Sequence, residues 1–219
     1  MPHGEIFASA HDGAGAAMAL ALALDRMRSV SGDPLADTPD ERPWLWVQDK
    51  EALRQGGRPY RPGLPRALRH RLVHVAARTP EDALFALEEG LRCRDLAFVI
   101  GEVAGNPRAL SLTASRRFSL AVEKHCVPFW LVRLDARRDP SSARMRWQAA
   151  SSPSPHPRWN TQAPGIASWH AELFRARAHP PGEWILRDEA DRLVAARPGA
   201  PPHNGDMADA AGARSLAAH

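Results

Sequence analysis

Residues 5–27, EIFASAHDGAGAAMALALALDRM, decide the fold of this chain. A short apolar run is followed by a glycine-containing loop and by a long apolar-patterned segment at 14–30, which predicts a strand, a turn and a helix. This is the local arrangement of a phosphate-binding loop, where backbone N–H groups at a helix N-terminus hold an anion. Such a loop carries Lys and then Ser or Thr after its last glycine, whereas Ala16 and Ala17 follow Gly15 here.

Strand-like and helix-like segments alternate along the following hundred residues. Thr79 and Pro80 begin a helix cleanly, as an N-cap and a first helical residue. The run at 96–103 is almost continuously apolar, as expected of a strand covered by helices on both faces. This alternation predicts an α/β fold with a mostly parallel sheet flanked by helices. The expected strands are 5–8, 42–49, 71–77, 96–103 and 127–133; the expected helices are 14–30, 79–93 and 113–125, with one short helix between 51 and 69.

The pattern changes after Leu134. A strand is expected at 142–150, followed by a Ser/Pro-rich loop at about 150–166 and a C-terminal antiparallel hairpin at 167–188. We therefore expect one core at 1–196. The remaining 23 residues, 197–219, have the composition of a disordered tail.

Composition excludes several classes of protein. The chain has 219 residues with two cysteines, so a disulfide scaffold or a cysteine-rich metal site is not expected. No run of 18 apolar residues is long enough to span a membrane, and the N-terminus lacks the pattern of a signal peptide. These features favour a cytoplasmic protein with no membrane contact.

Basic residues are clustered rather than spread evenly. The net charge is +4, and residues 52–80 contain seven arginines and no acidic residue. Such a cluster is either a solvated face or a binding surface for an acidic partner or a nucleic acid. The candidate partner or DNA contacts in it are Arg58, Arg61, Arg66 and Arg69.

Three further segments carry a family resemblance: LFALEEGLRCRDLAFVIGEV (84–103), LSLTASRRFSLAVEKHCVPFWLVR (110–133) and AELFRARAHPPGEWIL (171–186). With these segments, the chain from GEIFA to about residue 195 resembles the ImuA/SulA-like branch of the RecA superfamily. The resemblance implies a RecA-like fold. Family members usually carry more sequence before the first strand, so we expect either a misplaced start or a trimmed member.

The resemblance also implies which positions would hold an ATPase site. A RecA-type ATPase would have Lys and Thr at Ala16 and Ala17, and a magnesium-binding Asp at Gly101, which Glu102 on the opposite strand face would not replace. Its water-activating Glu would lie near Asp49. We therefore expect no catalytic residue, no metal and no cofactor, and a vestigial nucleotide loop formed by Asp12, Gly13, Gly15, Ala16, Ala17 and Gly101.

By resemblance, the chain is a non-enzymatic accessory protein of DNA-damage-induced (SOS) translesion mutagenesis. Its implied partners are RecA, an inactive Y-family polymerase-like protein and an error-prone replicative-type polymerase. The segments 105–112 and 134–142 are shorter than the DNA-gripping loops of RecA-type recombinases. The arginines at these places either make weak DNA contact or are solvated; they are Arg108, Arg116, Arg117, Arg137 and Arg138. The alternatives are a SulA-like inhibitor of cell division and a divergent ATPase.

Two other patterns are weaker. His70 and His74 have the spacing of a helical metal pair but lie in a predicted strand without a third ligand, so a structural role is favoured. Trp159 lies in the Pro-rich loop, where we expect it to be exposed to a partner.

Overall fold

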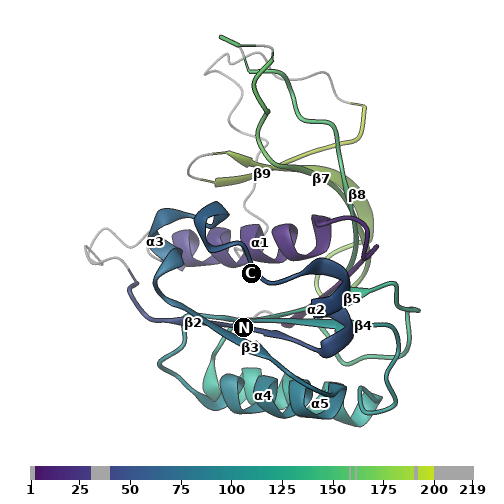
Figure 1. Ribbon diagram of the computed structural model, residues 1–219. Helices are drawn as coiled ribbons and strands as arrows, with labels where there is room; N and C mark the ends of the chain where they lie inside the picture. Colours follow the sequence, from purple (N-terminus) through teal and green to yellow (C-terminus); the bar gives the residue numbers. More distant parts are fainter. Residues whose placement is uncertain (1–2, 31–39, 158, 161, 190–191, 200–219) are drawn as a thin grey trace.

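A computed structural model describes residues 3–30, 40–157, 159–160, 162–189 and 192–199 (Figure 1). These residues form nine strands: β1 (His3–Ala8), β2 (Trp44–Gln48), β3 (Leu72–Ala76), β4 (Val99–Ala104), β5 (Phe129–Leu134), β6 (Met145–Ser151), β7 (Ser168–Ala176), β8 (Gly182–Glu189) and β9 (Arg192–Ala196). The helices among them are α1 (Ala14–Val30), α2 (Lys50–Gly56), α3 (Arg66–Arg69), α4 (Pro80–Arg92) and α5 (Leu112–His125), with a 3-10 turn at Arg61–Gly63.

All nine strands belong to one sheet, in the order β3-β2-β4-β5-β1-β6-β7-β8-β9. The first six strands of this order run parallel to one another. The predicted mixed α/β fold with a mostly parallel part is therefore confirmed. The apolar run at 96–103 supplies β4, which lies inside the sheet between β2 and β5. Strand β1 lies in the middle of the sheet, so the loop that follows β1 opens at its centre.

Helices cover both faces of the parallel part, as Figure 1 shows. On one face, α1 packs over side chains such as Trp44, Ile100 and Trp130. On the other face, α4 and α5 pack over Val99 and Leu131. Neighbouring side chains of a strand point to opposite faces, so the odd and even residues of β4 belong to different cores.

The predicted C-terminal hairpin is confirmed as β7 and β8, which pair antiparallel. The sequence did not predict β9, which adds a third antiparallel strand. These strands curve over α1, which lies between them and the parallel strands (Figure 1). The side chain of Asp25 in α1 is buried and accepts a hydrogen bond from the backbone N–H of Leu193 at 3.1 Å. The antiparallel strands thus complete the core around α1.

Helix starts follow their local sequence. The Thr79 hydroxyl accepts a hydrogen bond from Asp82 N at 3.1 Å, which confirms it as the N-cap of α4. The segment expected to hold one short helix instead holds α2, α3 and the 3-10 turn between them. The second helix was missed because α3 spans only four residues, too few to give a periodic pattern.

The remaining loops are as expected where they are described. Between Ser151 and Ser168, the described residues contain neither helix nor strand, and Trp159 is 90% exposed. The expected tail lies outside the described residues from 200 onward. Within the described ranges, no helix has the length and apolar character needed to cross a membrane.

Gly15 lets α1 approach the sheet closely. A Cβ atom at this position would lie 2.8 Å from Ala8 Cβ and 2.8 Å from Val132 Cγ1, closer than side chains can pack. A Cβ atom at Gly13 would meet nothing within 4 Å. The two glycines of this loop therefore differ, because only Gly15 is required by packing.

We expect the substitution G15A to lower the free energy of unfolding by about 1–3 kcal/mol, because the strands must move to admit one methyl group. The matched substitution G13A should change it by less than about 1 kcal/mol. Urea unfolding followed by circular dichroism measures both. Equal effects of the two substitutions would contradict this account of Gly15.

Candidate functional site

A cavity of about 490 Å³ opens at the carboxyl ends of β1, β2 and β4, beside the first turn of α1. Ligand sites of open parallel sheets lie at this edge of the strands. We call it the β1–α1 cavity. Its walls are Ala10, Asp12, Gly13, Ala16, Ala17, Leu20, Trp46, Gln48, Gly56, Gly57, Arg58, Pro59, Tyr60, Gly63, Leu64, Glu102 and Leu134.

The Asp12 carboxylate lies at the N-terminus of α1. Its Oδ1 accepts a hydrogen bond from Ala14 N at 3.0 Å and from Ser151 Oγ at 2.5 Å, and its Oδ2 accepts one from Ser151 N at 2.7 Å. Burial alone would raise the pKa of Asp12, but the hydrogen bonds from Ser151 and Ala14 outweigh it and lower the pKa. An ionised side chain of the protein thus occupies a helix end that favours anions.

The first turn of α1, Ala14 to Ala17, offers no side-chain donor. Ala16 and Ala17, in the first turn of α1, line the cavity with methyl groups only. Backbone N–H groups of a first helical turn bind anions best when a basic side chain assists them. The first turn of α1 therefore presents an apolar wall.

Glu102 is the buried acid of the cavity. Its side chain lies on the α1 face of β4, is only 4% exposed, and accepts hydrogen bonds from Trp46 Nε1 at 3.1 Å and Gln48 Nε2 at 2.8 Å. Burial raises the pKa of Glu102 to about 7, and the nearby Asp49 adds to the rise, while the two hydrogen bonds oppose it. At neutral pH this carboxyl group is thus divided between its two protonation states.

A side chain at position 101 would point away from the loop residues with which Gly101 is grouped from the sequence. A Cβ atom at position 101 would point to the α4 face, 2.8 Å from Leu87 Cδ1. The alternation of side chains along β4 places Glu102, not position 101, toward the cavity. An Asp at position 101, where a RecA-type ATPase would bind magnesium, would therefore point into the apolar core beneath α4 and not toward the cavity.

Asp49 has a structural role. Its Oδ1 accepts a hydrogen bond from Ala52 N at 2.7 Å and caps α2, while its Oδ2 accepts one from Ala104 N at 3.2 Å. Burial raises the pKa of Asp49 despite these hydrogen bonds. Because both oxygens are engaged and the side chain is 1% exposed, Asp49 is not placed to activate a water molecule.

His74 also serves the cavity indirectly. Its Nε2 lies 2.8 Å from Gln48 Oε1, and Gln48 in turn donates to Glu102. Burial lowers the pKa of His74, and the charges of Arg58 and Arg61 lower it further. No group of three potential metal ligands occurs in the described part of the chain. The pairing of His70 with His74 considered from the sequence therefore has no third ligand there.

The predicted basic contacts fall into two groups. Arg61 and Arg69 hold their own segment, because Arg61 Nη2 donates to Leu72 O at 3.3 Å and Arg69 Nε donates to Leu64 O at 2.6 Å. Arg58 and Arg66 are exposed and make neither a hydrogen bond nor an ion pair with any described residue. Only this second pair is available in full to a partner.

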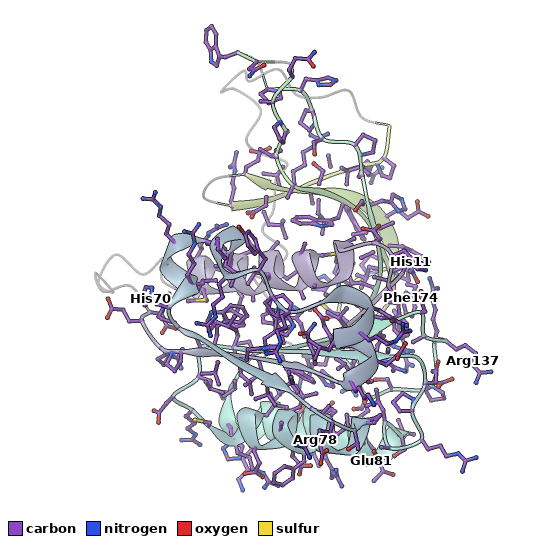
Figure 2. The ribbon with its side chains drawn as sticks, in the orientation of Figure 1. His11, His70, Arg78, Glu81, Arg137 and Phe174 are labelled. Carbon is purple, nitrogen blue, oxygen red and sulfur yellow. The ribbon has the colours of Figure 1, made fainter. Side chains whose placement is uncertain are left out.

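Arg116 and Arg117 lie away from these residues. Both belong to α5, on the sheet face opposite α1, and Arg117 forms an ion pair with Glu88 of α4 at 3.1 Å. Figure 2 shows Arg78 and Glu81 on this side as well, beside α4. The structure thus does not join the predicted basic residues into one surface.

The sequence analysis missed the polar centre of the cavity, formed by Trp46, Gln48 and Glu102. A signal was present, because Phe98, just before β4, and Ile100 alternate with Glu102 and belong to the α1 side of the sheet, as Glu102 does. An acid at the end of such an apolar row, on the face of the glycine loop, indicates a buried polar site.

A search of protein-family descriptions and a search of curated protein sequences each return no match for this chain.

Glu102 makes stability depend on pH. Its pKa is about 7 in the folded protein against an ordinary value of 4.5, so the folded state binds the proton more tightly. Its contribution to stability is therefore greatest below pH 4.5 and decreases as pH rises to about 7, by roughly 3 kcal/mol. We expect urea unfolding between pH 4.5 and pH 8 to show this decrease in the wild type relative to E102Q. Parallel pH profiles of the two proteins would contradict it.

Proposed function

We propose that this chain is a RecA-like accessory protein of DNA-damage-induced translesion mutagenesis in the cytoplasm. It acts without ATP hydrolysis, through contacts with RecA and an error-prone polymerase complex. Support comes from the segments that resemble the ImuA/SulA-like branch and from a glycine loop at the centre of a parallel sheet with helices on both faces.

The observation that carries the proposal is the Asp12 carboxylate at the start of α1. It accepts hydrogen bonds of 2.5–3.0 Å from Ala14 N in the first turn of α1 and from the N–H and hydroxyl of Ser151 in β6, at a helix end where a bound phosphate would be expected. A phosphate oxygen brought to about 4 Å from this carboxylate would be repelled by about 4 kcal/mol. The loop therefore keeps the backbone scaffold and disfavours its anion.

The cavity also lacks the groups that catalyse phosphoryl transfer. Such catalysis depends on a Lys and a metal ion that neutralise developing charge. Ala16 and Ala17 supply neither a Lys nor a metal-binding hydroxyl. Glu102 is a weaker magnesium ligand than an exposed carboxylate, because burial raises its pKa to about 7 and leaves only part of it ionised at neutral pH. A protein with this site acts by binding rather than by turnover.

The exposed side chains Arg58 and Arg66 offer a surface for acidic proteins and nucleoprotein. Basic surfaces of this kind increase association rates with such partners. RecA-type filaments assemble by head-to-tail contacts, so a RecA-like subunit without nucleotide turnover is suited to cap or join one. We expect this basic surface to contribute to binding.

The purified protein should neither hydrolyse ATP nor bind it tightly. The double substitution A16K/A17T should not restore hydrolysis, because the Asp12 carboxylate still repels a phosphate at the start of α1 and the buried Glu102 is only partly ionised at neutral pH. Release of phosphate from radiolabelled ATP and calorimetric titration measure the two activities. Turnover by the wild type that a substitution at residues 12–17 abolishes would show a divergent ATPase instead.

The double substitution R58E/R66E should weaken binding to RecA–DNA filaments, or to the polymerase-like partner, at least tenfold in biosensor titrations. Its thermal stability should hardly change, because exposed charges away from specific contacts change it by less than about 0.5 kcal/mol. The salt dependence of binding should decrease as well.

The matched variant R108E/R116E has the same net charge, and its exposed arginines lie at the α5 side of the sheet. It should retain wild-type affinity. Loss of binding in this variant alone would place the contact at the loops before α5. Capture of a tubulin-like division protein from DNA-damaged cells, with no replication protein, would replace the proposal by the division-inhibitor alternative.

A further inference from the structure

The β1–α1 cavity is acidic although the protein carries a net charge of +4. Two carboxyl groups, those of Asp12 and Glu102, line it, against the single guanidinium of Arg58. A third carboxyl group, that of Asp49, is not part of the cavity wall, but its charge disfavours ionisation of Glu102. The cavity is therefore chemically unlike the basic surface beside it.

Apolar side chains form much of the remaining wall, among them Leu20, Leu64 and Leu134. A volume of about 490 Å³ admits a small organic molecule or one long side chain. An apolar wall with one buried acid favours a ligand that has an apolar stem and a cationic end.

The positive groups near the cavity do not cancel the charge of Glu102. At the N-terminus of α1, the Asp12 carboxylate accepts a hydrogen bond from Ala14 N and offsets the positive end of the helix. Arg58 is exposed, so water screens its charge. His74 has a lowered pKa and contacts Gln48 rather than Glu102. Glu102, at 4% exposure, is thus the least screened charge that faces the cavity.

The two oxygens of Glu102 have capacity for further donors. Oε1 accepts one hydrogen bond, from Trp46, and Oε2 accepts one, from Gln48. A carboxylate oxygen can accept two. The planar fork of a guanidinium presents two parallel N–H groups at the spacing of the two carboxylate oxygens, and it carries a positive charge. An ammonium has the charge but not the fork, and a urea has N–H groups but no charge.

We propose that the β1–α1 cavity binds a guanidinium group carried on an apolar stem, with Glu102 as its counter-ion. The ligand is either a free alkylguanidine or an arginine side chain of a partner peptide. This site is separate from the role in mutagenesis and does not depend on it.

Binding should be coupled to the ionisation of Glu102. Only the ionised carboxylate attracts the cation, and its share of the population rises as pH passes through about 7. The apparent affinity should therefore be about tenfold higher at pH 8 than at pH 6.

The probe is n-butylguanidinium, compared with its neutral isostere n-butylurea. A peptide pair, acetyl-Gly-Arg-Gly-amide and its citrulline analogue, tests whether an arginine side chain of a peptide is bound. The indole N–H of Trp46 donates to Glu102, so its NMR signal, assigned with W46F, reports the site directly. We expect saturable binding of at least one guanidinium compound and binding of neither urea.

Three variants test the location. E102Q should weaken binding at least tenfold and remove its pH dependence. A17F places a ring in the cavity from an exposed position of α1 and should block binding even if E102Q is poorly folded. E81Q, which removes a charge from α4 on the other side of the sheet, should bind like the wild type (Figure 2).

Equal binding of n-butylurea, full binding by E102Q, or no saturable binding of either guanidinium compound would overturn the proposal. The variant R58E/R66E separates it from the proposed function. That variant should bind n-butylguanidinium more tightly, because a like charge leaves the cavity, while its binding to filaments decreases. The change in n-butylguanidinium binding tests the cavity, and the change in filament binding tests the proposed function, so one can fail while the other holds.

Discussion

The Asp12 carboxylate joins the two parts of the structure that meet at its centre. It holds the first turn of α1 through Ala14 N and the end of β6 through the backbone and hydroxyl of Ser151. Strand β6 is where the sheet changes from parallel to antiparallel pairing. One partly exposed carboxylate therefore ties the start of the central helix to the end of β6. A loop used in this way to hold the fold together is not free to exchange its anion for a ligand.

A buried ion pair joins strands β1 and β6 on the face of the sheet opposite α1. Glu5 of β1 and Arg146 of β6 form an ion pair at 2.8 Å, with side chains 1% and 4% exposed, and Ser141 donates to Glu5 at 2.7 Å. Buried pairs of this kind contribute little net stability but are costly to break, because one charge is left unpaired. Glu5 and Arg146 lie opposite each other in the register of β1 and β6, so a shift of this register would separate the two charges.

Periodicity predicted most of the fold, because the signals lie within single elements. The apolar run of β4, the N-cap Thr79 and the strand pair β7–β8 all appeared as local patterns. Strand β9 is five residues long and has no such pattern. The site was harder to predict. Whether position 101 or 102 faces the glycine loop depends on which helix covers which face, and that is decided by packing across the sheet. Likewise, Asp49 caps α2 through the nearby Ala52, but its second hydrogen bond, from Ala104 N, joins residues 55 positions apart and leaves no local pattern.

The segment between α2 and β3 connects the two surfaces of this protein. Its first part, with Gly57, Arg58 and Tyr60, lines the acidic cavity, and its later part carries Arg66 and Arg69. Gln48 donates a hydrogen bond to Gly57 O at 3.0 Å and another to Glu102. Gln48 is thus the one side chain that contacts both the buried acid and the start of this segment among the hydrogen bonds described. If a ligand of the cavity alters partner binding by this route, thermodynamic linkage requires that the partner alter ligand binding by the same factor.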